Sequence, residues 1–143
     1  MKKYLITAGV IITILVLGYI YFQGNVSISD SIIPKSQLED VIINTKEHSY
    51  MVTDSNTVLE LAKEVSKMKK LNKIDFYNYP PSKDQSVKFI KIYIQTKSMG
   101  TIGGSFWNNG NDIVLDSNGY YWLADKDLFD LMDTSLKEAK TLN

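Results

Sequence analysis

The chain has 143 residues, of which 44% are hydrophobic and 22% charged, and its formal net charge is zero. This composition is ordinary for one small globular domain with an appendage. Every basic side chain is lysine, so the planar guanidinium that favours bidentate recognition of phosphate is absent, and nucleic acid is not an expected partner. Cysteine is also absent, which excludes disulfides, thiolate nucleophiles and Cys-based zinc sites.

Residues 1–22 are predicted to be a transmembrane anchor. Lys2 and Lys3 precede residues 4–22, a run without a charged side chain through which we expect contact with the membrane. At a rise of about 1.5 Å per residue, this helix spans roughly 28 Å, close to the ~30 Å hydrocarbon core of a bilayer. The lysines at its start place the N-terminus inside the cell and the C-terminal domain outside. Abundant Lys, Ile and Asn without Arg favour a Gram-positive source.

A cleaved signal peptide is the alternative to an anchor. Cleavage at Ser27-Ile28-Ser29 would release a secreted domain. Retention is favoured because the apolar run is longer than a usual signal core and ends in Tyr19, Tyr21 and Phe22, which suit the headgroup region. No Cys follows the run, which excludes a lipoprotein anchor.

Residues 23–37 are predicted to form a short polar tether, and residues 38–143 an extracytoplasmic α+β domain. A first hairpin is expected at 41–52, because two short apolar runs flank T-K-E-H-S. Apolar residues at helical spacing from Val58 predict an amphipathic helix, with Asp54 or Thr57 as its N-cap. Residues 74–84 contain two adjacent prolines and are expected to form a loop.

The second half of the domain is predicted to be a strand, a meander and a helix. Residues 87–96 alternate, which places Ile90, Ile92 and Ile94 on one face of a central strand. Two Asn-Gly pairs within 105–123 predict type I′ hairpins. Apolar residues at helical spacing predict a second helix over 125–140. The expected order is β-β-α-β-β-β-β-α, an antiparallel sheet with two packed helices.

Counting outward from the Asn-Gly pairs gives a register for the meander. It pairs Trp107 with Asp112 and Asp116 with Tyr121. One face collects a core layer made of Phe106, Ile113, Leu115, Trp122 and Ala124. The other face is mixed and collects Trp107, Asp112, Val114, Asp116, Tyr121 and Leu123.

The order of motifs resembles a known group of envelope proteins. The hairpin, the T-D-x-x-x-V-x-x-L helix, the alternating strand, the N-G meander and the final Y-Y-W-L-x-D-x-D-L-F-x-L are similar to small extracytoplasmic domains of Gram-positive membrane proteins and lipoproteins of the YhfM-like kind. The resemblance covers most of residues 40–138. It implies an envelope location and carries no catalytic residue to this chain, which lacks the lipidated Cys of those lipoproteins.

The sequence shows no catalytic or metal-binding constellation. His48 is the single histidine and is expected in an exposed turn, without a second His for a metal site. D-S-N-G at 116–119 has only part of a calcium loop and lacks the later bidentate Glu. The aspartates at 125, 127 and 130 fit the first turns of a helix better than a metal site. We therefore expect no enzyme activity and no cofactor.

Three surfaces are candidates for contact with a partner. A basic surface carries lysines that suit an anionic polymer, lipid headgroups or an acidic protein. The loop F-Y-N-Y-P-P presents aromatic rings typical of protein contacts. The third is the mixed face of the meander. The candidate residues are Lys63, Lys67 and Lys70 on the first surface, Tyr77 and Tyr79 on the second, and Trp107, Asp112, Asp116 and Tyr121 on the third.

These observations favour a non-enzymatic, single-pass membrane protein whose outer domain binds an envelope protein or a peptide. An immunity-type protein that intercepts a secreted peptide is one form of this hypothesis. The alternative is a secreted or wall-associated hydrolase or hydrolase inhibitor, released by cleavage near Ser29.

Overall fold

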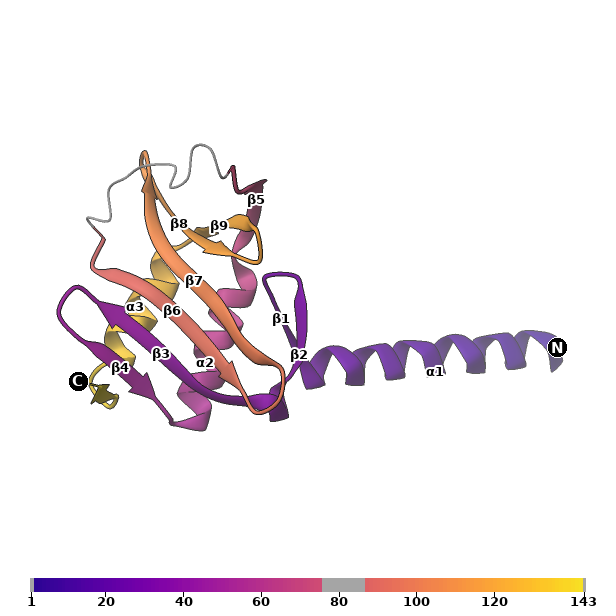
Figure 1. Ribbon diagram of the computed structural model, residues 1–143. Helices are drawn as coiled ribbons and strands as arrows, with labels where there is room; N and C mark the ends of the chain where they lie inside the picture. The colour runs from indigo at the N-terminus through magenta and orange to yellow at the C-terminus, as the bar shows by residue number, and fades with distance from the viewer. Residues whose placement is uncertain (1, 76–86, 143) are drawn as a thin grey trace.

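The computed structural model describes residues 2–75 and 87–142, and it has the α+β architecture that the sequence predicts (Figure 1). An apolar N-terminal helix leads into a domain with a large antiparallel sheet and two further helices. The elements are α1 (Lys2–Gly24), β1 (Asn25–Ile28), β2 (Ser31–Pro34), η1 (Lys35–Gln37), β3 (Leu38–Thr45), β4 (Ser49–Val52), α2 (Ser55–Lys67), β5 (Lys69–Lys73), β6 (Phe89–Thr96), β7 (Gly100–Asn109), β8 (Asp112–Ser117), β9 (Tyr120–Ala124), α3 (Lys126–Ser135) and β10 (Lys140–Leu142).

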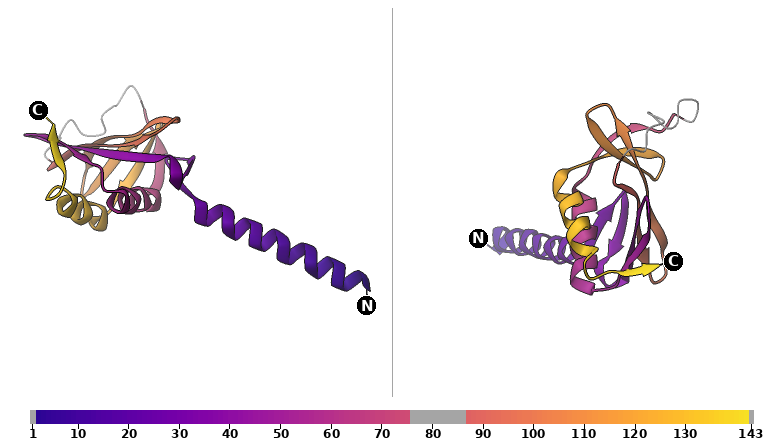
Figure 2. Two further views of the ribbon diagram at one scale, coloured as in Figure 1. Left: turned by 90° about the horizontal axis from the view of Figure 1, so that it is seen from below. Right: turned by 90° about the vertical axis from the view of Figure 1, so that its left-hand side faces the viewer.

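The main sheet has the strand order β10-β4-β3-β6-β7-β8-β9-β5, and each described pairing is antiparallel. Helices α2 and α3 lie side by side on one face of this sheet, and no described helix covers the other face (Figure 2). We call this second face the open face. An antiparallel sheet tolerates this arrangement because side chains alternate between a packed face and a solvated one.

The core lies between the sheet and the two helices. Val58, Leu61 and Val65 of α2 are at most 1% exposed, because their spacing places them on the side of the helix that meets the sheet. Leu128 and Met132 of α3 are fully buried for the same reason. The predicted core layer of the meander is confirmed, since Phe106, Leu115, Trp122 and Ala124 belong to this core and Ile113 packs against it.

Aspartates begin both helices. Asp54 caps α2 by accepting a hydrogen bond from the Thr57 amide at 2.8 Å, so it serves as the N-cap and Thr57 does not. The same hydrogen bond lowers the pKa of the Asp54 carboxyl, because it favours the ionised form. Asp125 caps α3 by accepting from the Leu128 amide at 3.0 Å.

A turn forms at each Asn-Gly pair, but only the second turn is centred on its pair and has the predicted register. Asn118 and Gly119 take positive φ of 51° and 78°, and Asp116 pairs with Tyr121 as predicted. The first turn is centred one residue later, on Gly110 and Asn111, and Trp107 therefore pairs with Val114 instead of Asp112. Gly110 alone has positive φ there, as in a type II′ turn. Because the turn moves by one residue, each residue of β7 pairs with a β8 residue two positions further on. Residues two apart in a strand lie on the same face, so the side chains stay on the predicted faces of the sheet.

Strand β6 also departs from its predicted alternation at its start. Ile92 and Ile94 are fully buried, but Ile90 is only partly buried, while Phe89 is 3% exposed. The cause is a register shift between β3 and β6: Asn44 pairs with Lys91 and the next residue, Thr45, pairs with Phe89, so Ile90 is an extra residue in β6. A bulge of this kind changes the face on which the following side chains lie.

The predicted polar tether at residues 23–37 is wrong, because residues 25–34 form the hairpin β1–β2. Its turn residues, Ser29 and Asp30, both take positive φ, at 49° and 67°. Val26, Ile28 and Ile33 are at most 6% exposed and belong to the core. The segment that joins the apolar helix to the domain is therefore part of the folded domain.

Candidate partner-binding surface

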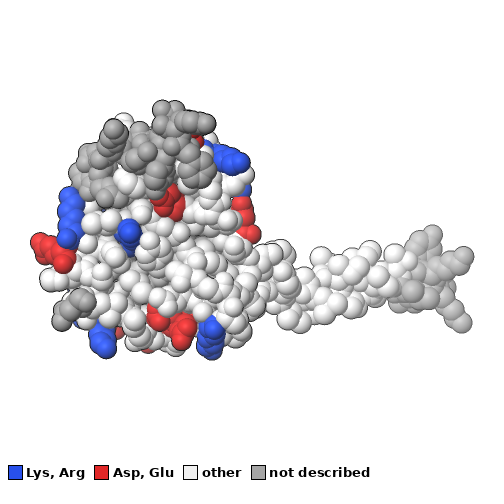
Figure 3. Space-filling view, viewed as in Figure 1, with Lys and Arg blue, Asp and Glu red and all other residues white. Residues whose placement is uncertain are grey.

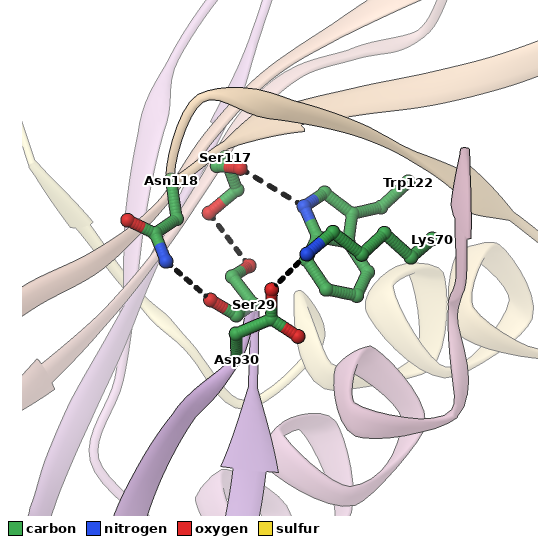
Figure 4. Close-up of polar contacts among 6 residues, drawn as sticks. All are labelled: Ser29, Asp30, Lys70, Ser117, Asn118 and Trp122. Atoms are coloured by element: carbon green, nitrogen blue, oxygen red, sulfur yellow. Dashed lines mark hydrogen bonds and ion pairs between the residues drawn. The ribbon is translucent and has the colours of Figure 1, made fainter. Parts of the chain in front are cut away.

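The tip of the β1–β2 hairpin is hydrogen-bonded to the turn between β8 and β9 (Figure 4). The Ser29 hydroxyl donates to the Ser117 hydroxyl at 2.7 Å, and the Asn118 side-chain amide donates to the Ser29 carbonyl at 2.7 Å. Ser29 and Ser117 are 3% and 4% exposed, so both hydroxyls depend on each other for hydrogen bonding. Contacts about ninety residues apart in sequence thus fix the hairpin to the sheet.

A lysine from β5 adds to this contact. Lys70 forms an ion pair with Asp30 at the hairpin tip, and its ammonium lies 3.7 Å from the centre of the Tyr120 ring. The Trp122 indole beside it donates to the Ser117 carbonyl at 2.9 Å. Because the Lys70 and Asp30 side chains are 37% and 50% exposed, the ion pair contributes only about 0–1 kcal/mol. The buried hydroxyl pair therefore matters more for the position of the hairpin.

The apolar helix joins this hairpin without a spacer. α1 ends at Gly24 and β1 begins at Asn25, whose side-chain amide donates to the Tyr21 carbonyl at 2.6 Å. The Lys35 ammonium donates to the Gln23 carbonyl near the end of the helix. In Figure 1, α1 extends away from the domain from the corner where β1 and β2 lie. The helix and the domain are thus connected through ordered, hydrogen-bonded residues.

Three of the four predicted meander residues come together on the open face. Asp116 accepts a hydrogen bond from the Trp107 indole at 2.9 Å through one oxygen and from the Ser105 amide at 2.6 Å through the other. Tyr121 lies directly opposite Asp116 in the ladder and is 5% exposed. Burial raises the pKa of the Tyr121 hydroxyl, and the negative charges of Asp116 and Asp75 raise it further.

Asp112 lies apart from this group. It pairs with Asn109 next to the β7–β8 turn and is exposed. The aspartates of the meander are therefore not gathered into one site. Among the described residues, no group of three or more acidic or histidine side chains is placed to hold a metal ion.

Two glycines of β7 permit the close packing beside Asp116. A Cβ on Gly104 would overlap the backbone carbonyl of Asp116, and one on Gly103 would overlap the carbonyl of Ile92. Gly103 also has a φ of 143°, which other residues rarely adopt. Sequence reasoning missed these positions, although the pair Gly103-Gly104 within a strand pattern signals a close backbone approach.

The three predicted lysines do not form one basic surface. Lys63 and Lys67 line a groove of about 370 Å³ between α2 and α3, together with Glu60, Glu64 and Asp127. The Lys67 ammonium donates a hydrogen bond to the Glu64 carboxylate at 2.5 Å, and this bond raises the pKa of the lysine. Lys70 belongs instead to the hairpin contact on β5. Acidic side chains thus accompany the lysines in the groove, and its charge is mixed.

Two further sequence predictions concern loops. His48 lies in the exposed turn between β3 and β4, as expected. Tyr77 and Tyr79 lie outside the described residues.

The open face has few charges over its central strands. In Figure 3, most of the described surface over β3, β6 and β7 is uncharged, and Lys, Asp and Glu side chains gather mainly at the rim. Tyr93 and Gln95 of β6 point to this face, because the alternate residues Ile92 and Ile94 are buried in the core. The open face therefore combines half-buried aromatic and amide side chains on regular strands.

Comparisons with protein-family models, with curated proteins and with solved structures found no match.

Proposed function

We propose that this protein is a non-enzymatic, single-pass membrane protein whose outer domain binds a protein or peptide partner at the cell envelope. α1 is the anchor, the N-terminus lies inside the cell, and the domain lies outside. An immunity-type protein that intercepts a secreted peptide is a concrete form of this function.

The exposure of α1 supports the membrane anchor. Residues Thr7–Gly24 form a helix long and apolar enough to cross a membrane, about 27 Å at 1.5 Å per residue. The large apolar side chains of this segment are at least half exposed, from Val16 at 50% to Phe22 at 79%. A surface of this size and apolarity is unfavourable in water, and a bilayer covers it completely.

The hairpin supports retention of the anchor over release by cleavage. A cut after Ser29 would remove all of β1 from the mature chain and leave β2 without its partner strand. It would also remove the buried Val26 and Ile28 side chains, each of which stabilises the fold by about 1.5–3 kcal/mol. A released domain would thus lack part of its own core. N-terminal sequencing of the mature protein distinguishes the two forms.

The observation that carries the partner-binding proposal is the open face. It has no helix over its described strands, it is poor in charge, and hydrogen bonds from Trp107 and Ser105 to Asp116 hold its side chains in place. Ordered aromatic residues at low charge density are typical of the central part of protein interfaces. The anchor adds a high effective concentration of the domain for partners at the same membrane.

Site-specific photocrosslinking in native membranes tests this function. A photoreactive benzoylphenylalanine replaces Tyr93 or Gln95 on the open face, and Glu60 on the opposite side of the domain provides the matched control. We expect one discrete adduct from the open-face positions and none from position 60. Adducts from position 60 alone, or none from any position in cells that express the protein from its own promoter, would contradict the proposal.

A further inference from the structure

Strand β7 has an open edge over the first half of its length. Its residues 106–109 pair with β8, whereas residues 100–105 pair only with β6. The hairpin β1–β2 forms a separate two-stranded sheet and makes no ladder with β7. No described strand therefore pairs with the outer side of β7 between Gly100 and Gly103.

The backbone groups on this edge have a definite direction. The Ser105 amide points away from β6, because it donates to the Asp116 carboxylate on the side of β8. The ladder between β6 and β7 has no register shift, and backbone groups of alternate residues in an antiparallel strand point to the same side. The N–H and C=O groups of Thr101 and Gly103 thus point outward as well. Thr101 is exposed and Gly103 partly exposed.

A hollow of about 250 Å³ lies beside this edge. Ser31 of β2 and the β8–β9 turn form its other walls, and the lining consists of Ser31, Thr101, Ile102, Gly103, Ser117 and Asn118. None of these side chains is ionisable. Ile32, which follows Ser31 in β2, is 51% exposed, which is unusual for a large apolar residue of this domain. The hydrogen bonds of Ser29 to Ser117 and Asn118 hold the wall formed by the hairpin.

The other edges of the main sheet are less suited to receive a strand. Edge strand β5 carries three lysines in five residues, and edge strand β10 has only three residues. Short length and lysine are the features with which sheet edges avoid pairing with other chains. The edge of β7 has neither feature, since Gly100–Gly104 contains no charged residue.

We propose that an extended, uncharged peptide segment of a partner protein enters this hollow and adds to β7 as a strand. The segment lies where β8 would continue alongside β7 if the chain did not turn at Asn118. There it hydrogen-bonds to the backbone of Thr101 and Gly103. The absence of ionisable lining residues selects against charged side chains in the segment, and the need for backbone amides selects against proline. This inference rests on the proposed function and names the partner segment and its place.

A matched pair of variants isolates the backbone contribution. Thr101→Pro removes the outward N–H, which by this alternation is not part of the β6–β7 ladder, and we expect the fold to be retained. Thr101→Val removes the hydroxyl but keeps the N–H. Circular dichroism and thermal unfolding of both full-length proteins confirm that they fold.

The probe is a phage-displayed library of random linear peptides, selected on the full-length protein in nanodiscs. We expect enriched peptides that slow amide hydrogen exchange at Thr101 and Gly103 by at least about tenfold. We also expect Thr101→Val to bind them as the original chain does, while Thr101→Pro and alternately N-methylated peptides lose at least about tenfold in affinity.

Two outcomes overturn the inference and are distinguishable from a failure of the proposed function. Peptides that bind equally to the proline variant, or that protect other amides, place peptide binding elsewhere on the domain. Failure to select any peptide contradicts the inference that a peptide segment adds to β7. The photocrosslinking from Tyr93 and Gln95 then reports separately on binding of a folded partner.

Discussion

At the scale of single residues, Asn118 has two roles in the contact between the hairpin and the sheet. Its φ of 51° is accessible to Asn and Gly at little cost, and its side-chain amide donates to the Ser29 carbonyl. We expect Asn118→Gly to lower the free energy of unfolding by about 1 kcal/mol, the value of the hydrogen bond. Asn118→Ala adds backbone strain and lowers it by about 2–3 kcal/mol. Urea unfolding of the full-length chain in detergent measures both, and equal stability of all three proteins contradicts this account of the turn.

Tyr121 gives the domain a specific alkaline sensitivity. Its pKa in the folded chain is raised above the unfolded value of about 10, so folding favours the protonated hydroxyl. The stabilisation is complete below pH 10 and is lost as the pH rises through the folded pKa, because the unfolded chain then releases its proton first. We expect Tyr121→Phe to lose less stability than the original chain as the pH rises above about 10. Thermal unfolding measures both proteins over this pH range. If both lose stability equally, the alkaline sensitivity does not come from Tyr121.

Sequence patterns predicted those residues of the site that depend on local geometry. Asn118-Gly119 was identifiable as a turn because both residues tolerate positive φ, and Asp116 and Tyr121 followed from counting outward. Ser29 was not identifiable, because its role depends on Ser117, a partner 88 positions away. A buried serine pair has no local pattern, and only the tertiary fold reveals it.

At the scale of elements, the β1–β2 hairpin makes a strong contribution to the core. Ile33 is fully buried, whereas its neighbour Ile32 is 51% exposed, so the two residues form a matched pair. We expect Ile33→Ala to lower the free energy of unfolding by about 2–5 kcal/mol. Ile32→Ala should stay within about 0.5 kcal/mol of the original chain. If the segment were a tether, both variants would be as stable as the original chain in chemical unfolding.

The elements themselves were predictable to different degrees. Amphipathic spacing and capping aspartates were sufficient for α2 and α3, because helix signals are local. Strands β1 and β2 escaped prediction because four-residue strands among Ser, Asn and Pro have too few apolar positions for a period of two. The first meander turn was misplaced by one residue, since Asn109-Gly110 and Gly110-Asn111 both make acceptable two-residue loops. Packing of the whole sheet selects between them.

At the scale of the whole molecule, the buried hairpin connects the apolar helix directly to the domain. α1 passes into β1 without a spacer, and β1 and β2 contribute Val26, Ile28 and Ile33 to the core. We expect this connection to hold the open face and the edge of β7 at a fixed angle to α1. Under the proposed function, a fixed angle would reduce the entropy lost when a partner in the same membrane binds.

The width of the distance distribution between α1 and the domain tests this rigid connection most directly. The chain has no cysteine, so Tyr19→Cys and Glu60→Cys introduce the only two spin labels, one on α1 and one on α2. Pulsed electron–electron double resonance on the labelled protein in nanodiscs should give one narrow distribution of distances between the two labels. A control with about six Gly and Ser residues inserted between Gly24 and Asn25 should give a broad one. If the original sequence gave a distribution as broad as that of the control, the rigid connection of α1 and the domain would be contradicted.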